Sequence, residues 1–394
     1  MPAMSAAPLS HFGDDDSLPT GPGYLPRTLV LLGAGFAHLQ ALQQLARKPL
    51  IGVHVVLVAP HPRQMVAARI PAWVAGRVVL EDCSIALEPL VQRAGVRWMQ
   101  CGVRGLDAAE RLVVLDEGEP LAYDWLSINT GPNHNRDQLE QAMPGVRAHG
   151  LFVRPIDRFA TLWPQVVAKA DESPLRLAVI GGGGAGIELA LAAHARLPQS
   201  AITLVCGNGP PGANFNPATQ RRIAALLRRR GITVLQGGAT GFSEGVVQLG
   251  CGATLACDVP LIAVGAHAPA WLQGSGLALD PQGFVAIDAC LRSTSHPEVL
   301  AAGDVSSRAD PAVARNGTHA LHAGAALVRN LVAIASGQAP AAHRPPPHSL
   351  SLLGCGNGQA ILDWGGFSMQ GYGVGWLKRT LDRRLVSRFA ATVR

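Results

Sequence analysis

The apolar positions near the start of the chain form a strand, a tight glycine turn and a helix. Residues 28–32 are a β-branched and apolar run that leads into residues 33–38 (GAGFAH), and leucines at helical spacing follow the turn. A further strand at residues 53–58 completes a βαβ unit of about the usual 30 residues. The pattern predicts a dinucleotide-binding fold in this part of the chain.

The same pattern recurs in the second half of the chain. A strand at residues 177–180 leads into a turn at 181–186 (GGGGAG), a helix at 187–196 and a strand at 201–205. A helix at 221–230 and strands at 232–235 and 259–264 are expected to follow. The predicted fold class is therefore α/β, with two Rossmann-like dinucleotide-binding domains.

Three further segments complete the predicted order of elements. Strand-like residues 111–115 and 125–129 lie between the two units, and the second ends at a turn, Thr130-Gly131-Pro132. Downstream, a buried strand ends in Gly303-Asp304, and an amphipathic helix at about 318–336 follows. The proline-rich residues 340–347 then separate a last segment.

The glycine turns are the candidate cofactor sites. A pyrophosphate binds where free N–H groups and the positive dipole end of a helix meet it, and glycines let the backbone approach closely. Gly181, Gly183 and Gly186 have the full spacing, whereas Gly33 and Gly35 are followed by His38 at the third position. A tight turn in an ordinary α/β domain is the alternative for either motif alone, but two such turns favour dinucleotide binding.

The residues that distinguish NAD from NADP are missing. No Asp or Glu occurs between residues 28 and 80 or between Glu188 and Glu244, where an acidic residue would bind the ribose hydroxyls. No Arg lies just after residue 205 to receive a 2′-phosphate. The choice between NADH and NADPH stays open.

Composition and cysteine content fit a well-packed globular protein in a reducing compartment. The 394 residues allow two to three domains, and 48% apolar residues with only 15% charged ones argue against disorder. Residues 1–26 are expected to be a flexible tail without a signal-peptide pattern, and no apolar run is long enough to span a membrane. Seven cysteines without a CxxC pair favour a cytoplasmic protein, and we expect no metal ion at the site.

The C-terminal end is strongly basic and amphipathic. Residues 376–394 hold six cations and one carboxylate, within a formal net charge of +6 for the chain. No nucleic-acid motif accompanies them, so we discount nucleic acid. Apolar residues recur there at four-residue spacing: Leu377, Leu381, Leu385 and Phe389. Such a helix could lie peripherally on the inner face of the cytoplasmic membrane, or dock on its own core with a solvated basic face.

One segment resembles a known family signature. Residues 294–304 run Thr, four residues, four apolar residues, Gly-Asp, which resembles the second FAD signature of the pyridine nucleotide-disulfide oxidoreductases. The resemblance covers roughly residues 27–389 and is closest to type II NADH dehydrogenase-like proteins and to the module found fused to selenide, water dikinase. It implies that Asp304 binds the ribityl chain of FAD, that Gly303 admits the cofactor, and that Thr130-Gly131 lies near the flavin. Thr294 opens the signature. In such relatives the third position of the first turn is also occupied by His.

The resemblance also bears on how electrons leave the flavin. Family members named for disulfide chemistry carry a CxxxxC pair, which this chain lacks, so we expect direct transfer to an acceptor. In type II dehydrogenases that acceptor is a quinone, but the corresponding residues 314–322 lack the expected glutamines. The candidate catalytic residues are His319, as a flavin hydrogen-bond partner or proton relay, and Glu188, which the resemblance brings near the nicotinamide. A packing role is the alternative for His319.

The sequence thus predicts an FAD domain at residues 27–150 and 290–335, an NAD(P)-binding domain with its linker at 151–289, and a C-terminal segment at 336–394. Hydride would pass from NAD(P)H to FAD, and electrons then to a quinone or another small acceptor. One alternative is a reductase for a soluble protein or selenium-related partner, and another is a non-catalytic redox sensor. The oligomeric state, a homodimer included, is left open.

Overall fold

A computed structural model describes residues 26–265, 267–309 and 317–390. Its first large sheet has five parallel strands and is assembled from two separated parts of the chain. In spatial order the strands are β19 (Val299–Ala301), β9 (Trp125–Ile128), β1 (Arg27–Leu32), β2 (Val53–Val58) and β5 (Arg97–Met99). Because β19 joins this sheet from beyond the second βαβ unit, the predicted discontinuous dinucleotide-binding fold is confirmed.

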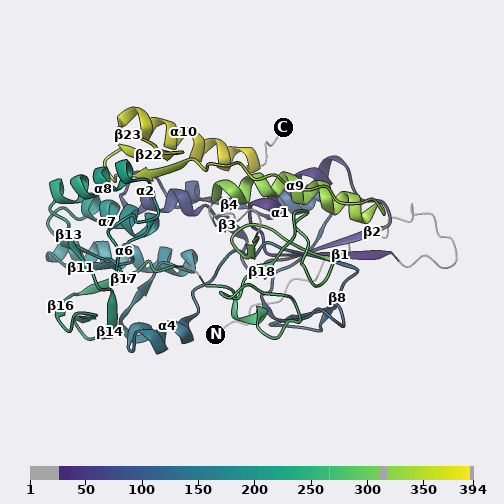
Figure 1. The fold of residues 1–394 in the computed structure, drawn as a ribbon, viewed down its shortest axis with the longest axis horizontal. Helices are drawn as coiled ribbons and strands as arrows, with labels where there is room; N and C mark the ends of the chain where they lie inside the picture. The colour runs from purple at the N-terminus through teal and green to yellow at the C-terminus, as the bar shows by residue number, and fades with distance from the viewer. Residues whose placement is uncertain (1–25, 266, 310–316, 391–394) are drawn as a thin grey trace, which may run out of the picture.

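The second large sheet is also five-stranded and parallel. Its order is β10 (Leu151–Phe152), β17 (Val259–Ile262), β11 (Arg176–Ile180), β12 (Ala201–Val205) and β13 (Thr233–Leu235). The two sheets occupy opposite halves of the molecule, with β11 and β17 on the left and β1 and β2 on the right of Figure 1. In both sheets the glycine turn follows the carboxyl end of a central strand, which is where open α/β sheets bind ligands.

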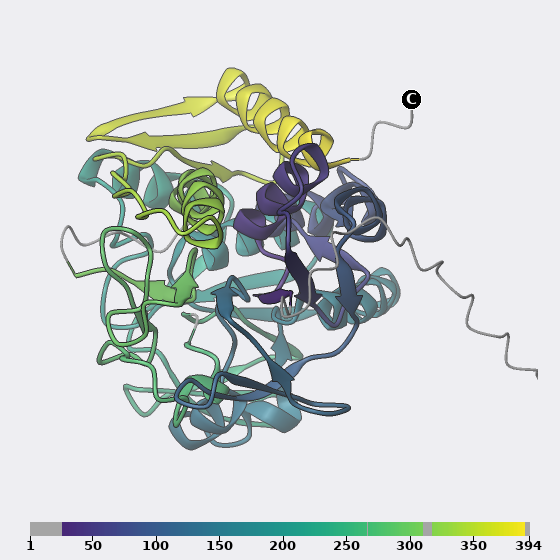
Figure 2. The same ribbon diagram turned by 90° about the vertical axis from the view of Figure 1, so that its right-hand side faces the viewer.

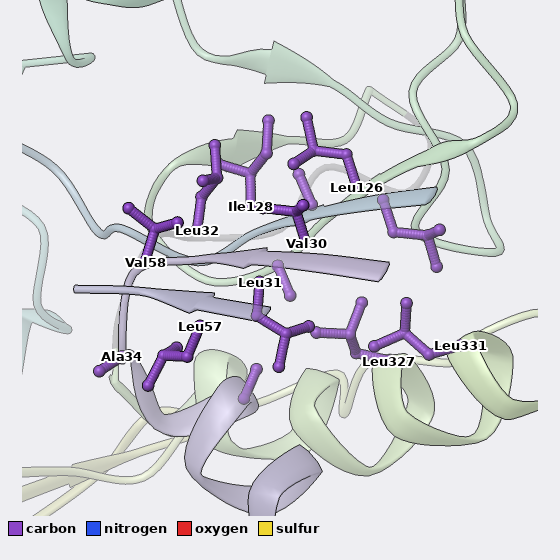
Figure 3. Close-up of a cluster of buried hydrophobic side chains, with 14 of the residues drawn as sticks. Val30, Leu31, Leu32, Ala34, Leu57, Val58, Leu126, Ile128, Leu327 and Leu331 are labelled. Atoms are coloured by element: carbon purple, nitrogen blue, oxygen red, sulfur yellow. The ribbon is translucent and has the colours of Figure 1, made fainter. Parts of the chain in front are cut away.

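The first sheet is buried on both faces, as parallel sheets generally are. The helices α1 (Phe36–Arg47) and α9 (Gly317–Ala335) pack against each other and cover one face. Figure 3 shows Leu31 of β1 directed toward Leu327 and Leu331 of α9, while Val30 is directed away from these helices. The continuous apolar runs of the sequence therefore give a core on each side of the strands.

The remaining helices and strands extend these two halves. The helices are α2 (Ile70–Val74), α3 (Glu88–Ala94), α4 (Arg136–Ala142), α5 (Val146–His149), α6 (Ile156–Glu172), α7 (Gly184–Arg196) and α8 (Pro217–Arg229). The 3₁₀ turns are η1 (Ala67–Arg69), η2 (Glu81–Cys83) and η3 (Ala270–Leu272). One small antiparallel sheet has β6 (Val103–Asp107), β7 (Leu112–Leu115) and β8 (Leu121–Ala122), and another has β14 (Ala239–Ser243), β15 (Val246–Leu249) and β16 (Thr254–Ala256). Two-stranded pairs are formed by β3 (Arg63–Met65) with β4 (Ser84–Ala86) and by β18 (Val285–Ala286) with β20 (Ser306–Ser307).

The C-terminal segment is a three-stranded antiparallel sheet followed by a helix. The strands are β21 (Ser351–Gly354), β22 (Ala360–Trp364) and β23 (Phe367–Gly371), and the helix is α10 (Tyr372–Phe389). The two views show this yellow segment lying along one side of the molecule, and Figure 1 shows it extending over both halves. Among the described residues, no helix combines the length and apolar character needed to cross a bilayer. The predicted tail at residues 1–26 lies almost wholly outside the described residues.

The Leu stripe of α10 is largely covered by protein, as in the docked helix that was one of the two predicted arrangements. Phe389 is only 1% exposed and stacks obliquely on Phe36 with ring centroids 6.4 Å apart. Leu377 and Leu385 are half-buried, and only Leu381 is exposed. Phe389 and Leu385 pack on the core of the first sheet and Leu377 packs beside β22, so the helix is docked on the protein at both of its ends.

Candidate functional site

The first glycine turn is packed tightly against the end of β9. Gly33 adopts a left-handed φ of 85°, and a Cβ there would lie 2.5 Å from Cα of Thr130. A Cβ on Gly35 would collide with the side chain of Asn129. Both predicted glycines are therefore required by close contact between the turn and the neighbouring strand, not only by space for a ligand.

His38 replaces the third glycine of this turn with a buried hydrogen-bonding side chain. Its Nδ1 lies 2.6 Å from the carbonyl oxygen of Gly33, and its Nε2 lies 2.8 Å from Oγ of Ser127. Because a carbonyl can only accept, Nδ1–H donates to Gly33 and the Ser127 hydroxyl donates to Nε2. Burial lowers the pKa of His38 to about 4, although the bond to Gly33 acts in the opposite direction. The imidazole is therefore neutral and braces the turn against β9.

Asn129 connects the first turn to two strand ends. Its side-chain oxygen accepts hydrogen bonds from the amides of Ala37 at 3.1 Å and His38 at 3.3 Å, and its amide nitrogen donates to the carbonyl of Ala302 at 2.5 Å. The side chain is thus a cap supplied from a distant strand, which satisfies two of the N-terminal N–H groups of α1. A bound pyrophosphate would meet an N-terminus that is already partly capped.

The second turn is open where the first is capped. Gly186 packs so closely on Gly181 that an added Cβ would collide with its carbonyl oxygen. By contrast, a Cβ on Gly183, the N-cap of α7, would meet no atom within 4 Å. Within the described ranges, no side chain accepts a hydrogen bond from the first amides of α7. This N-terminus has the free N–H groups and the space that a pyrophosphate needs.

Gly303 and Asp304 come together with α9 at the same edge of the first sheet. Gly303 has a left-handed φ of 78°, and a Cβ there would lie 2.9 Å from the Asn129 amide nitrogen and 3.6 Å from the Ala320 side chain. The carboxylate of Asp304 acts electrostatically on Arg154, whose pKa is lowered mainly by burial and partly restored by Asp304. A carboxylate and a cation, both half-buried, therefore lie together near the end of β19, where polar groups of a dinucleotide can be bound.

The three remaining residues of the predicted cofactor site lie at two places. Thr130 follows β9 and lies against Gly33, and Gly131, with a left-handed φ of 70°, comes next in the same turn. Thr294 instead lies before β19, at the amino end of the strand, with its backbone N–H donating to Ala286 at 3.0 Å. Thr294 and Asp304 thus flank β19 at its opposite ends, and the role of Thr294 in cofactor binding stays a prediction.

The Glu188 carboxylate contacts two residues of the C-terminal segment. Its Oε1 accepts a hydrogen bond from the amide of Gly354 at 2.6 Å and lies 3.8 Å from Nζ of Lys378. Burial raises the pKa of Glu188, opposed by Lys378 and by the bond to Gly354. Its predicted approach to the nicotinamide stays a prediction, whereas its contacts join α7 to β21 and α10.

His319 lies in the first turn of α9, close to Gly303 through the neighbouring Ala320. Burial, with a smaller contribution from the positive charge of His322, lowers the pKa of His319. The imidazole is therefore mostly neutral near pH 7 and keeps one donor and one acceptor nitrogen. Residues 314–316 of the predicted acceptor stretch lie outside the described residues.

A backbone bridge joins the two sheets at their carboxyl ends. Asn133, beyond β9, and His267, beyond β17, exchange two backbone hydrogen bonds of 2.9 and 2.8 Å. His134 next to this bridge is 5% exposed, and burial, with the charge of Arg154 as a further cause, lowers its pKa to about 4. The bridge brings the two candidate nucleotide sites to one junction.

Sequence reasoning did not assign roles to Asn129, Ser127, Arg154 or Lys378. Their contacts join segments far apart in the chain, so no local spacing points to them. The seven cysteines are all unpaired in the structure, and Cys83, Cys206, Cys257 and Cys355 are buried.

One family and several known proteins are similar to the chain. The family described as pyridine nucleotide-disulphide oxidoreductase matches residues 27–326. An NADH dehydrogenase-like protein of Mycobacterium tuberculosis is 27% identical over 300 residues, covering 71% of this chain and 72% of that protein. Demethylphylloquinone reductase of Synechocystis is 28% identical over 216 residues, covering 52% of each. NDH2 from Plasmodium falciparum, solved with NADH, shares the fold with a TM-score of 0.77 at 13% identity, over 92% of this chain and 97% of that one.

Proposed function

The chain belongs to the pyridine nucleotide-disulphide oxidoreductase family, and on that basis we propose that it is an NAD(P)H dehydrogenase that reduces a quinone. Family membership confirms the predicted cofactors, FAD and a nicotinamide dinucleotide. Bound FAD would supply the ability to accept a hydride from the reduced nicotinamide and to pass two electrons to the acceptor. The chain itself positions the two ligands and excludes water.

The nicotinamide dinucleotide is assigned to the second turn. The observation that carries this is the open N-terminus of α7, where Gly183 leaves space above helix N–H groups that lack a protein acceptor among the described residues. A diphosphate there would be stabilised by those donors and by the positive end of the helix. Gly181 and Gly186 supply the close packing that keeps this helix end near β11.

FAD is assigned to the first sheet, with domain bounds at 27–150 and 290–335 and the nicotinamide domain at 151–289. Gly33, Gly35 and Thr130-Gly131 would line the diphosphate, and Asp304 the ribityl hydroxyls. The half-buried guanidinium of Arg154, which interacts electrostatically with Asp304, would meet an anionic group of the cofactor. His319 would bind a polar atom of the flavin from the start of α9.

The exposed surface of the C-terminal segment is suited to a membrane, and a membrane-bound protein would have access to a quinone. This C-terminal aromatic surface comprises Trp364, Phe367, Met369, Tyr372 and Trp376, which are 46–65% exposed. Beside it, α10 exposes four cations: Arg379, Arg383, Arg384 and Arg388. Aromatic side chains at the headgroup level together with arginines suit the face of an anionic bilayer, in which quinones dissolve. We propose that this surface, not the Leu stripe of α10, rests on the membrane.

The function is tested by purifying the protein and recording its visible spectrum. A yellow protein whose flavin band bleaches on adding NADH or NADPH without oxygen has the proposed first half-reaction, and the effective donor identifies the preferred nicotinamide. Re-oxidation by a water-soluble quinone would support the second half. Bleaching without quinone turnover would instead indicate a protein acceptor, and a protein that binds no FAD would overturn the proposal.

Membrane binding by the C-terminal aromatic surface is tested by sedimentation with vesicles that contain an anionic phospholipid. Replacing Phe367 and Trp376 by Ser should weaken vesicle binding by roughly tenfold or more, because two exposed aromatic side chains no longer leave water. Ile51, 91% exposed and outside this surface, provides the control Ile51→Ser. Equal binding by both variants would contradict the assignment of this surface.

A further inference from the structure

The strand β21 lies between the two helices whose N-termini face the proposed dinucleotide sites. On one side, the hydroxyl of Thr318 in the first turn of α9 donates to the carbonyl of Leu350 at 3.1 Å. This anchor is two residues from Ala320, which lies against Gly303. Residues 350–354, here called the strap, are therefore fixed at their first residue to the flavin side of the site.

The other end of the strap is fixed to the nicotinamide side. The amide of Gly354 donates to Glu188 of α7 at 2.6 Å. The Leu353 side chain also packs on the start of α7, because a Cβ on Gly184 would lie 3.2 Å from its Cδ2. Five residues in extended conformation span roughly 13 Å, and β22 pairs along the strap, so its length is set by the strand backbone.

Lys378 of α10 holds this anchor in place. Its side chain is 11% exposed, and its Nζ donates to the carbonyl of Ala68 at 2.9 Å, lies 3.1 Å from Asp382 and is 3.8 Å from Glu188. Ala68 belongs to η1, in the stretch between β3 and β4, whereas Glu188 belongs to α7. One buried ammonium group thus joins the N-terminal part of the chain, α7 and α10.

Removing this cation would leave two carboxylates enclosed without their shared partner. Asp382 is 18% exposed and Glu188 12% exposed, so water would solvate neither fully. An unpaired buried charge is costly, and the contacts around it rearrange to reduce that cost. Without Lys378, no cation holds the Glu188 carboxylate between α7 and α10, so Glu188 would turn toward water and move the bond to Gly354, which is the anchor of the strap.

We propose that the strap, held by Lys378 and Glu188, sets the spacing between the two dinucleotide sites, which makes both residues positioning residues for hydride transfer. This inference rests on the proposed function, because the spacing matters only if both ligands bind as assigned. Transfer between bound groups depends steeply on their separation, and a misplacement of about 1 Å can slow a reaction about a hundredfold.

The test compares Lys378→Met with Lys169→Met in the full-length flavoprotein. Both variants replace one lysine by methionine, but Lys169 is exposed on α6 and lies outside the proposed binding surfaces. For Lys378→Met we expect the limiting rate of anaerobic flavin reduction by the effective nicotinamide to fall roughly tenfold or more, while each ligand's affinity changes by less than about threefold. Amide exchange in residues 351–354 should rise about tenfold. Lys169→Met should behave as the unmodified protein.

Two further variants keep the test decisive if Lys378→Met does not fold. Lys378→Arg retains the charge with a different reach, and Glu188→Gln retains an acceptor for Gly354 while removing the ion pair. Both should slow flavin reduction by a smaller factor than Lys378→Met and raise exchange in the strap. Normal reduction rates and unchanged strap exchange in folded variants would overturn the inference. A wild-type protein that NAD(P)H does not reduce would overturn the proposed function, whereas the exchange measurement would still report on the strap.

Discussion

The turns after β1 and after β11 occupy equivalent places in two parallel sheets, but they hold helix against strand in different ways. At the second turn, Gly186 lies against the carbonyl of Gly181 with no room for a side chain. At the first, His38 occupies the same position and donates a hydrogen bond to the carbonyl of Gly33. The third position of the motif is therefore a contact with the first glycine's carbonyl. Glycine makes it by close approach, and histidine by a hydrogen bond.

The helix ends beyond these turns differ as well. Asn129 caps two amides of α1 from β9, whereas among the described residues no side chain caps α7. A capped helix end is fixed before any ligand arrives, while an open one presents free donors. The difference fits a first site that holds its cofactor permanently and a second site that exchanges NAD(P)H in each turnover.

Converting the first turn to the glycine pattern of the second should have the largest effect. His38→Gly leaves a cavity, removes two buried hydrogen bonds and places glycine inside a helix, so we expect a loss of roughly 4 kcal/mol of stability. Urea unfolding measures it, and FAD affinity should fall as the turn loosens. If His38→Gly were as stable as the unmodified protein, the hydrogen bonds of His38 would not be bracing the turn.

Adding a side chain at the third position of the second turn should lower the stability somewhat less. Gly186→Ala places a methyl group against the carbonyl of Gly181, and we expect a loss of roughly 3 kcal/mol because backbone must move. Gly183→Ala is the matched control, since the same methyl group there meets no protein atom. Thermal unfolding of both variants decides the matter: equal midpoints would show that the tight contact at Gly186 is unimportant.

Acid should produce the smallest of these stability changes, because it protonates His38 more readily in the unfolded chain. His38 has a pKa of about 4 in the fold and about 6.5 unfolded, so only the unfolded chain binds its proton between those values. Its contribution is complete above about pH 6.5 and is lost as pH falls toward 4, giving about 2 kcal/mol between pH 8 and pH 5. His134 adds to the same trend. Urea unfolding at both pH values should therefore give a smaller pH dependence for His38→Gly, and an unchanged one would contradict a buried neutral imidazole.

Local patterns predicted the elements that form the two sheets. The expected strand at residues 53–58 coincides with β2 and that at 201–205 with β12, because continuous apolar runs between turns are typical of buried parallel strands. The expected helix at 221–230 begins earlier, at Pro217, because the Asn216 side chain caps it by accepting from Thr219 at 2.9 Å. Asparagine next to proline was the available signal for that start.

Contacts between distant segments could not be predicted in the same way. The bond from Gly354 to Glu188 joins residues 166 positions apart, and the cap from Asn129 to Ala37 spans 92. Nothing near Glu188 in the sequence distinguishes a carboxylate that faces a nicotinamide from one that anchors a strand. The short strands β21, β22 and β23 were missed because four or five residues of mixed polarity carry little periodicity.

The assignment of one dinucleotide to each turn is tested most directly by comparing Asp304→Ala with Gly183→Ala for binding of FAD and of NAD(P)H. We predict that Asp304→Ala weakens FAD binding by about tenfold or more while the apoprotein still binds NAD(P)H. Gly183→Ala should remain yellow but bind NAD(P)H about tenfold more weakly, because its methyl group occupies the approach to α7. Loss of NAD(P)H binding in folded Asp304→Ala, with FAD retained, would contradict the account.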